Sequence, residues 1–362
     1  MSTRTPEPRD AVGRIPVYVP GRPPTPRPGL TTYKLSSNEN PFPPLPGVIE
    51  AARAAVDLAN RYPDMGNTRL YEGLSARLGV PQEDLAAGTG SVALIYHLLQ
   101  AFCDPGHEVV HAWRSFEAYP IAIASVGAVS VPVPLTAECR HDLEAMLAAI
   151  TDRTRVVLLC TPNNPTGPAL TQSEVDAFLD RVPSHVVVVL DEAYLEFVRM
   201  PDAVDGPGTY RSRSNVVLFR TFSKAYGLAA FRVGYAVAPA PIAAALRAVS
   251  LPFGVSSVAQ AAALASLDAH DELMRRVDSL VAERDRIGAA LREQGWPLPD
   301  AQGNFVWFGF DDAARTTAFA AACEDAGIVV RPYGADGARV SIGEVEGNDR
   351  LLQVAAGFVD AS

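Results

Sequence analysis

The chain has 362 residues, of which 48% are hydrophobic and 20% charged, and its formal net charge at pH 7 is −10. This composition is typical of a globular protein and argues against a disordered body, while the length favours two domains over one. The acidic balance argues against nucleic acid or an anionic membrane as the main partner. No apolar run is long enough to span a membrane and the first residues do not form a signal peptide, so we expect a cytoplasmic location.

The four cysteines and six histidines show none of the spacings that are typical of metal sites. We therefore expect no metal. The cysteines should be reduced thiols that pack as small hydrophobic residues.

Residues 1–35 are rich in proline, which excludes the interior of a helix or sheet and predicts an extended N-terminal arm. The apolar residues Val17, Tyr18 and Val19 suggest that part of the arm docks on the rest of the protein. A disordered tail is the alternative.

Residues 36–248 carry the pattern of a large α/β domain. Helices are expected at 48–59, 91–102 and 171–181. Short apolar runs, several of them rich in valine, occur at 107–112, 128–133, 155–160, 185–190, 215–219 and 232–238. Continuous hydrophobic runs are typical of strands buried on both faces, so they predict a mostly parallel sheet covered by helices.

Residues 249–362 are expected to form a smaller α+β domain. The stretch 256–294 predicts one long helix, 304–310 a strand, 314–326 a helix, and 328–342 a pair of strands.

A lysine follows the predicted strand at 215–219, in the run Thr221-Phe222-Ser223-Lys224. A lysine just past a buried strand is poorly placed for a solvated charge, and a desolvated amine is a usable nucleophile. Thr221, Ser223 and Arg232 supply two hydroxyls and a guanidinium, which suit a phosphate dianion. The alternative is a surface lysine in a turn.

Two more polar groups follow neighbouring predicted strands. Asp191 ends the run at 185–190, where a carboxylate is costly unless it meets a cation, and Tyr194 lies three residues further on. Asn164 follows the run at 155–160 in the turn Asn163-Asn164-Pro165-Thr166-Gly167. A helix cap for Asp191 and a plain turn around Asn164 are the alternatives.

Taken together, the three motifs resemble those of fold type I pyridoxal-phosphate-dependent aminotransferases of the class II subgroup. The run TFSKAYGLAA is similar to the lysine signature of that subgroup, and NNPTG and DEAY precede it in the expected order. The resemblance implies that Lys224 holds the cofactor and moves the Cα proton. It also implies that Asp191 keeps the pyridine nitrogen protonated and that Asn164 and Tyr194 contact the phenolic oxygen.

The resemblance also assigns roles further along the chain. Gly90, Ser91 and Val92 open the helix at 91–102, where free amides and the helix dipole attract a phosphate. Phe116 is expected to stack on the pyridine ring, with core packing as the alternative. Tyr62 matches a tyrosine that reaches the phosphate of the neighbouring subunit, which implies a homodimer with shared active sites.

The substrate side is predicted by the same resemblance. Arg339 should bind the α-carboxylate through its planar fork. Arg331 is a second basic group, for which a surface ion pair is the alternative, and Tyr18 and Asn38 are further candidates. Amino acids and 2-oxo acids are the implied substrates, exchanged by a ping-pong route.

The stretches at 16–21, 90–94, 113–120 and 330–337 are similar to actinobacterial aromatic amino acid (phenylalanine) aminotransferases. The histidinol-phosphate aminotransferases are the alternative, but they commonly have an acid pair after the glycine turn and a tyrosine where Phe116 stands. The segment 228–232, Leu-Ala-Ala-Phe-Arg, departs from the usual Leu-Ala-Gly-Leu-Arg. A non-catalytic regulator is disfavoured by the acidic charge and the lack of a helix-turn-helix, and a decarboxylase or lyase is disfavoured by Arg339.

Overall fold

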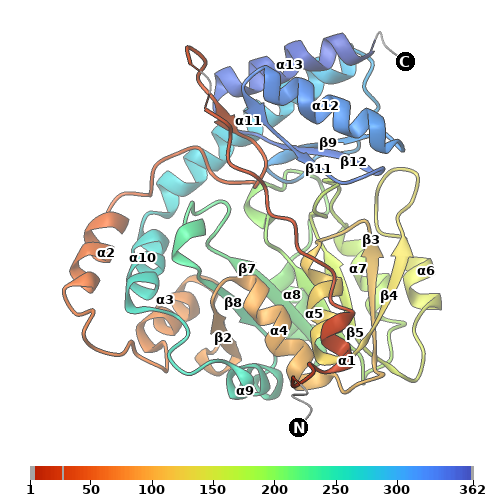
Figure 1. Cartoon of the computed structure of the whole chain (residues 1–362). Coiled ribbons are helices and arrows are strands. Elements are labelled where there is room, and N and C mark those ends of the chain that lie inside the picture. Colours follow the sequence, from red (N-terminus) through yellow and green to blue (C-terminus); the bar gives the residue numbers. More distant parts are fainter. Residues whose placement is uncertain (1–4, 27, 360–362) are drawn as a thin grey trace.

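The computed structural model describes residues 5–26 and 28–359, and its central element is a seven-stranded sheet (Figure 1). The strands lie in the order β2-β8-β7-β6-β5-β3-β4. Their bounds are Leu85–Gly88 (β2), Gly234–Val237 (β8), Val216–Thr221 (β7), Val187–Asp191 (β6), Thr154–Cys160 (β5), Glu108–Trp113 (β3) and Val129–Pro134 (β4). Only β8 is antiparallel to its neighbours. The expected mostly parallel α/β sheet is confirmed.

The valine-rich strands are buried because both faces of the sheet are covered. Along β5, Val157 and Leu159 pack into one hydrophobic core, whereas Val156 and Leu158 pack into the other. β6 and β7 alternate in the same way. This explains why these strands read as unbroken apolar runs.

One face carries α4 (Ser91–Phe102), α5 (Ala118–Val126) and α9 (Ala240–Val249), and the other is covered by α6 (Leu143–Ala148), α7 (Gln172–Leu179) and α8 (Gly206–Ser212). α4 has the bounds that the sequence predicts.

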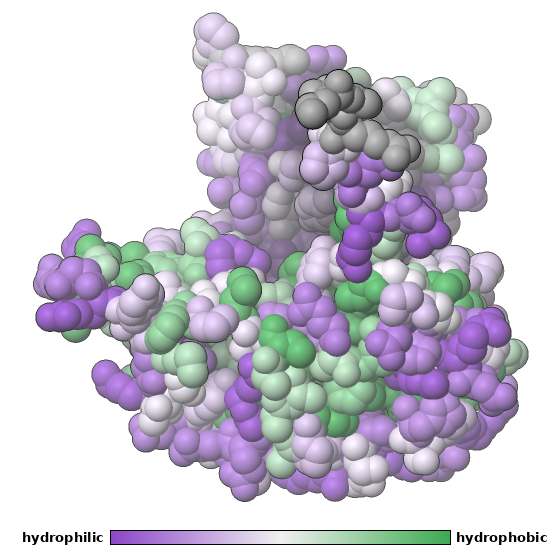
Figure 2. Space-filling view, turned by 60° about the horizontal axis from the view of Figure 1, so that its bottom comes forward, coloured by the Kyte–Doolittle hydropathy of each residue, from purple (hydrophilic) through white to green (hydrophobic). Residues whose placement is uncertain are grey.

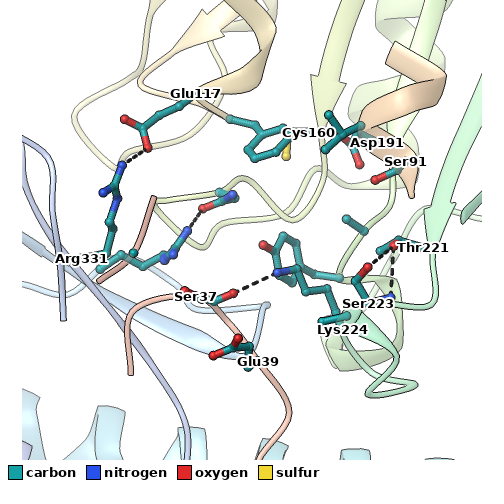
Figure 3. A pocket seen from close by; sticks show the side chains of 18 of the residues that line it. Ser37, Glu39, Ser91, Glu117, Cys160, Asp191, Thr221, Ser223, Lys224 and Arg331 are labelled. Atoms are coloured by element: carbon teal, nitrogen blue, oxygen red, sulfur yellow. Dashed lines mark hydrogen bonds and ion pairs between the residues drawn. The ribbon is translucent and has the colours of Figure 1, made fainter. Parts of the chain in front are cut away.

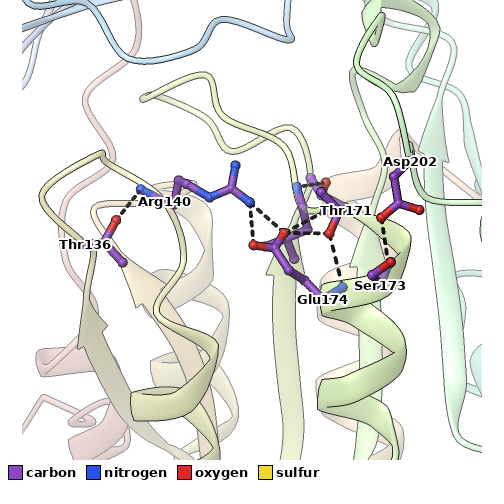
Figure 4. A network of polar contacts seen from close by, with 8 residues as sticks. Thr136, Arg140, Thr171, Ser173, Glu174 and Asp202 are labelled. Carbon is purple, nitrogen blue, oxygen red and sulfur yellow. Dashed lines mark hydrogen bonds and ion pairs between the residues drawn. The ribbon is translucent and has the colours of Figure 1, made fainter.

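A polar network fixes the start of α7 (Figure 4). The Thr171 hydroxyl accepts a hydrogen bond from the Glu174 amide, and the Glu174 carboxylate accepts one from the Thr171 amide, at 3.1 and 2.8 Å. This reciprocal pair satisfies two amides that the first helical turn leaves free. Arg140 binds the same carboxylate at 2.6 and 2.8 Å, so the loop after β4 is tied to the helix that follows the Asn164 turn.

The predicted long helix at 256–294 is two helices. α10 (Ser257–Asp268) packs on α2 (Val48–Val56) and α3 (Thr68–Leu78), and α11 (His270–Glu293) runs towards the C-terminal part (Figure 1). Ala269 separates them with φ −92° and ψ 28°. The sequence has no glycine or proline at this break, so the break could not be predicted. The two helices pack against different elements, which sets the position of the break.

The C-terminal part contains a three-stranded antiparallel sheet of β11 (Arg331–Pro332), β12 (Gly337–Ser341) and β9 (Phe305–Gly309). It is accompanied by α12 (Ala313–Asp325) and α13 (Val345–Val359), while β10 (Ile328–Val329) pairs in parallel with β1 (Tyr33–Lys34). The N-terminal chain therefore contributes a strand to this part.

The arm runs along the molecule from the central domain to the C-terminal part (Figure 1). It is mostly extended, but Asp10–Gly13 form one helical turn (α1) against α5, between two prolines of the arm. Arg9 donates a hydrogen bond to the Ser125 carbonyl at 2.6 Å. Part of the arm thus docks, as Val17, Tyr18 and Val19 suggested, although these three side chains are themselves exposed.

The space-filling view shows hydrophobic residues scattered among hydrophilic ones over the face it presents (Figure 2). None of the helices in the described ranges is long and apolar enough to cross a membrane.

Candidate active site

A cavity opens at the carboxyl ends of the parallel strands, where Asp191 ends β6, Thr221 ends β7 and Asn164 follows β5 (Figure 3). Parallel neighbours end at the same edge of a sheet, so the three motifs meet there. The predicted residues that line the cavity are Tyr18, Ser91, Val92, Phe116, Asn164, Asp191, Tyr194, Thr221, Ser223, Lys224, Arg232, Arg331 and Arg339. The walls come from the arm, the large sheet and the C-terminal part.

Lys224 lies in the short connection between β7 and β8. Its Nζ donates a hydrogen bond to the Ser37 carbonyl at 3.1 Å and lies 5.7 Å from the centre of the Tyr194 ring. Burial, and then the positive charge of Arg339, lower the pKa of the amine to about 7. A substantial fraction of Lys224 is therefore uncharged near neutral pH, as a nucleophile or base requires.

Asp191 is buried, and one of its carboxylate oxygens accepts a hydrogen bond whereas the other accepts none. Tyr119 donates a hydrogen bond to Oδ2 at 2.8 Å, and Oδ1 has no hydrogen-bond partner. Burial raises the pKa of this carboxyl to about 6. A buried oxygen without a partner is costly, so Asp191 fits a cationic group such as a protonated pyridine nitrogen.

The N-terminus of α4 and the connection after β7 form a site suited to an anion. The first turn of α4 has no side-chain cap, and while the Ala93 amide donates to the Gly90 carbonyl at 3.1 Å, the amides of Ser91 and Val92 are available to a ligand. Beside it, the Thr221 hydroxyl donates to Ser223 at 3.0 Å and Arg232 Nη1 donates to Ser223 at 3.3 Å. These groups fit a phosphate dianion.

Gly90 lies just before α4 with φ +82°. A Cβ at this position would lie 2.5 Å from Nη2 of Arg232. The glycine allows the guanidinium to approach the helix start.

Arg339 is buried and has an unused donor. Its Nη1 donates to Asn164 Oδ1 at 2.5 Å, its Nη2 donates to the Ser36 carbonyl at 2.7 Å, and its Nε has no partner. In the described part of the chain, no carboxylate lies within ion-pair distance of it. Its charge is thus available to a carboxylate ligand.

Asn38 is placed behind the cavity wall. Its Nδ2 donates to the Tyr194 hydroxyl at 3.0 Å, and its Oδ1 accepts from Ser341 at 2.9 Å. Asn38 therefore orients Tyr194 instead of lining the cavity. Burial raises the pKa of the Tyr194 hydroxyl, so the group stays protonated.

Tyr62 lies outside the cavity. Its side chain is 82% exposed and its ring stacks on Phe253 with 4.6 Å between centroids. A contact with a cofactor would need a second subunit.

The site also contains groups that the sequence did not predict, among them Tyr119, Ser37, Glu117 and Tyr333. Tyr119 binds Asp191, Ser37 accepts from Lys224, and Glu117 forms an ion pair with Arg331. Tyr119 and Glu117 lie within three residues of Phe116 in the sequence. This closeness to a predicted site residue is the signal that could have pointed to them.

The family model for "Aminotransferase class I and II" matches residues 31–354. The chain belongs to this family. An "Aromatic amino acid aminotransferase" of Streptomyces avermitilis is 56% identical over 358 residues, which cover 99% of both chains, and one of Thermobifida fusca is 53% identical over 96% of both. A solved histidinol-phosphate aminotransferase from Sinorhizobium meliloti, in complex with pyridoxal-5'-phosphate, is 30% identical with a TM-score of 0.84 over 92% of both chains.

Family membership confirms the predicted fold type, the aminotransferase class and the pyridoxal phosphate cofactor. The residues at the strand ends fit that cofactor, with a neutral amine, an unpartnered acid and an anion site in one cavity. The individual residue roles stay predictions. The described residues contain no group of three or more side chains that could hold a metal.

Proposed function

We propose that this aminotransferase transfers the amino group of phenylalanine and tyrosine to 2-oxoglutarate, with pyridoxal phosphate on Lys224. The observation that carries the reaction type is the buried Lys224 in one cavity with the unpartnered oxygen of Asp191. The full-length relatives named for aromatic amino acids support the substrate.

When bound, pyridoxal phosphate takes up the amino group and withdraws electrons from the substrate Cα. Asp191 would keep the pyridine nitrogen protonated. The amides of Ser91 and Val92, together with Thr221, Ser223 and Arg232, would hold the phosphate. Lys224 Nζ accepts the proton from the substrate Cα and delivers it to the cofactor carbon that would carry the amino group. Its pKa of about 7 lies close to neutral pH, so Nζ can both accept and release a proton.

The substrate carboxylate binds Arg339, whose Nε is free. The side chain then lies among aromatic residues, since Tyr18, Phe116 and Tyr333 all line the cavity. This lining favours a phenyl or phenol ring.

The second candidate is a histidinol-phosphate aminotransferase. The solved structure from Sinorhizobium meliloti and the presence of Arg331 beside Arg339 in the cavity favour it. Two features of the sequence argue against it. Phe116 stands where a tyrosine is usual, and the residues directly after Gly90, Ser91-Val92-Ala93-Leu94, include no acidic pair.

The two candidates are separated by kcat/KM for phenylalanine, tyrosine and histidinol phosphate at saturating 2-oxoglutarate. We expect the aromatic amino acids to be preferred by at least tenfold. A tenfold preference for histidinol phosphate would establish the second candidate instead.

The homodimer with shared sites is also part of the proposal. Large apolar side chains are exposed in two segments, at Val56, Leu58, Tyr62 and Met65 and at Leu251 and Phe253, and the Tyr62 ring stacks on Phe253. Exposed apolar side chains of this size support a contact with another chain. The cytoplasmic location stays a prediction.

A further inference from the structure

The cavity contains two arginines from adjacent strands. Arg331 of β11 and Arg339 of β12 are direct partners in the antiparallel ladder, so their side chains lie on the same face. Both residues are buried and both line the cavity. Two bare guanidiniums at this place would together favour a ligand group with a double negative charge, such as a phosphate.

The two arginines differ in their partners. Arg339 has only neutral partners, whereas Arg331 Nη2 forms an ion pair of 2.7 Å with Glu117 Oε2. The side chains of Arg331 and Glu117 are 8% and 25% exposed, so water screens this pair less than a surface pair. Arg331 Nη1 also donates to the Pro20 carbonyl of the arm at 3.2 Å.

The ion pair lies on the side of the cavity away from the phosphate-binding groups. Figure 3 shows Glu117 and Arg331 together at one side, with Thr221 and Ser223 at the other. The Arg331 guanidinium also lies 5.3 Å from the centre of the Tyr333 ring. Arg339 lies 5.8 Å from the centre of the same ring. At this end of the cavity Glu117 therefore offsets the charge of Arg331, and Arg339 keeps the one charge that binds a substrate carboxylate.

We propose that Glu117 is a specificity-determining residue, which neutralises Arg331 and so selects donors with an uncharged aromatic side chain over donors that carry a phosphate. The inference deepens the proposed function and rests on it. An uncharged ring leaves the ion pair intact and packs beside it. A phosphate dianion that approached Arg331 would face the Glu117 carboxylate or displace it, and either outcome disfavours binding.

The test compares Glu117→Gln with the native holoenzyme. Glutamine keeps an oxygen that accepts from Arg331 but removes the negative charge. We measure kcat/KM for phenylalanine and for histidinol phosphate at saturating 2-oxoglutarate. The ratio of histidinol phosphate to phenylalanine should rise at least tenfold in Glu117→Gln.

Asp336→Asn is the matched control. Asp336 pairs with Arg114, a neighbouring arginine, and does not line the cavity that contains Lys224. The same change of charge at this position should leave the ratio within twofold of the native value. A rise in this variant equal to that in Glu117→Gln would overturn the proposal, because net charge alone would explain it.

Glu117→Ala separates the effect of the negative charge of Glu117 from the effect of its side-chain volume. If the ratio rises in Glu117→Ala but not in Glu117→Gln, the carboxylate acts through its volume and the proposal is wrong. An unchanged ratio in both variants, with native thermal unfolding, also overturns it. Failure of the native enzyme to use phenylalanine would instead contradict the proposed function, so the two failures are distinguishable.

Discussion

Burial changes the pKa values of Lys224 and Asp191 in opposite directions. It lowers the pKa of the amine to about 7 and raises that of the carboxyl to about 6. In both cases the low-dielectric surroundings disfavour the charged form. A cationic pyridine ring beside Asp191 would hold that carboxylate ionised, so cofactor binding and the charge state of the site are coupled.

The pKa of Lys224 predicts how the cofactor-free enzyme captures pyridoxal phosphate. Only the neutral amine attacks the aldehyde, so the rate of capture should rise with pH through a midpoint of about 7 and then level off. Stopped-flow absorbance of the bound cofactor, over a pH series, measures this rate. A midpoint near the ordinary lysine value of 10.5 would contradict the assignment.

Tyr119→Phe should reduce, but not abolish, the contribution of the Asp191 carboxylate to the rate of transamination. The tyrosine hydrogen bond lowers the pKa of Asp191, so its loss should shift the acid limb of the kcat/KM profile to higher pH. A hydrogen bond to a charged group contributes about 1.5–3 kcal/mol, which limits the loss of rate to roughly 10- to 150-fold.

Asp191→Asn is the reference for this comparison and should cost more than Tyr119→Phe. If Tyr119→Phe lowers the rate but leaves the acid limb in place, Tyr119 only fills space in the core.

At the scale of the elements, the central strands β5, β6 and β7 were predictable because they are buried on both faces. All three were expected from their apolar runs, and their common direction brings Asn164, Asp191 and Thr221 to one edge. β2 was not expected, since its sequence Leu-Ala-Ala-Gly carries no preference for a strand. β8 runs antiparallel to β7, and the connection between them, residues 222–233, contains a single 3-10 turn at Ala229–Phe231 in place of a crossover helix.

The partners of the site residues were less predictable than the residues themselves. Tyr119 and Asp191 are 72 positions apart, and Glu117 and Arg331 are 214 apart. No local pattern encodes such pairings, because they depend on how strands and helices meet in space. The sequence therefore predicted most of the groups that meet in the cavity, but not which groups orient them or set their charge.

Gly90→Ala tests the contact between the start of α4 and Arg232. The substitution strains a backbone with φ +82° and brings a methyl group to 2.5 Å from the guanidinium. The strain lowers folding stability by about 1–3 kcal/mol. Moving Arg232 away from the phosphate loses a hydrogen bond to a charged group, about 1.5–3 kcal/mol, so the Kd for pyridoxal phosphate should rise roughly 10- to 150-fold.

Titration of the cofactor-free protein with pyridoxal phosphate measures this Kd. Gly357→Ala is the control, because a Cβ there meets nothing within 4 Å. Equal affinity in Gly90→Ala and the control would show that the glycine has no role in the phosphate site.

At the scale of the whole molecule, the proposed homodimer would cover the exposed Tyr62 and the Phe253 ring that stacks on it. Mixing tests whether sites are shared. Lys224→Ala chains should be inactive, and Tyr62→Phe chains should bind the cofactor roughly 10- to 100-fold more weakly, since a hydrogen bond to a charged phosphate is lost.

Mixed dimers place both changes in one site and leave the other intact. At limiting pyridoxal phosphate, the mixture should therefore exceed the summed activity of the two separate variants. No gain on mixing, together with native cofactor affinity in Tyr62→Phe, would remove the case for shared sites.

The central claim is that Lys224 drives amino transfer from an aromatic amino acid. It is tested most directly by the half-reaction, in which holoenzyme meets phenylalanine without any 2-oxo acid acceptor. We expect the native enzyme to form one equivalent of phenylpyruvate per chain, with loss of the aldehyde form of the cofactor, and Lys224→Ala to form at most a trace. If the native enzyme releases no 2-oxo acid, or if Lys224→Ala releases as much as the native enzyme, Lys224 does not drive this reaction.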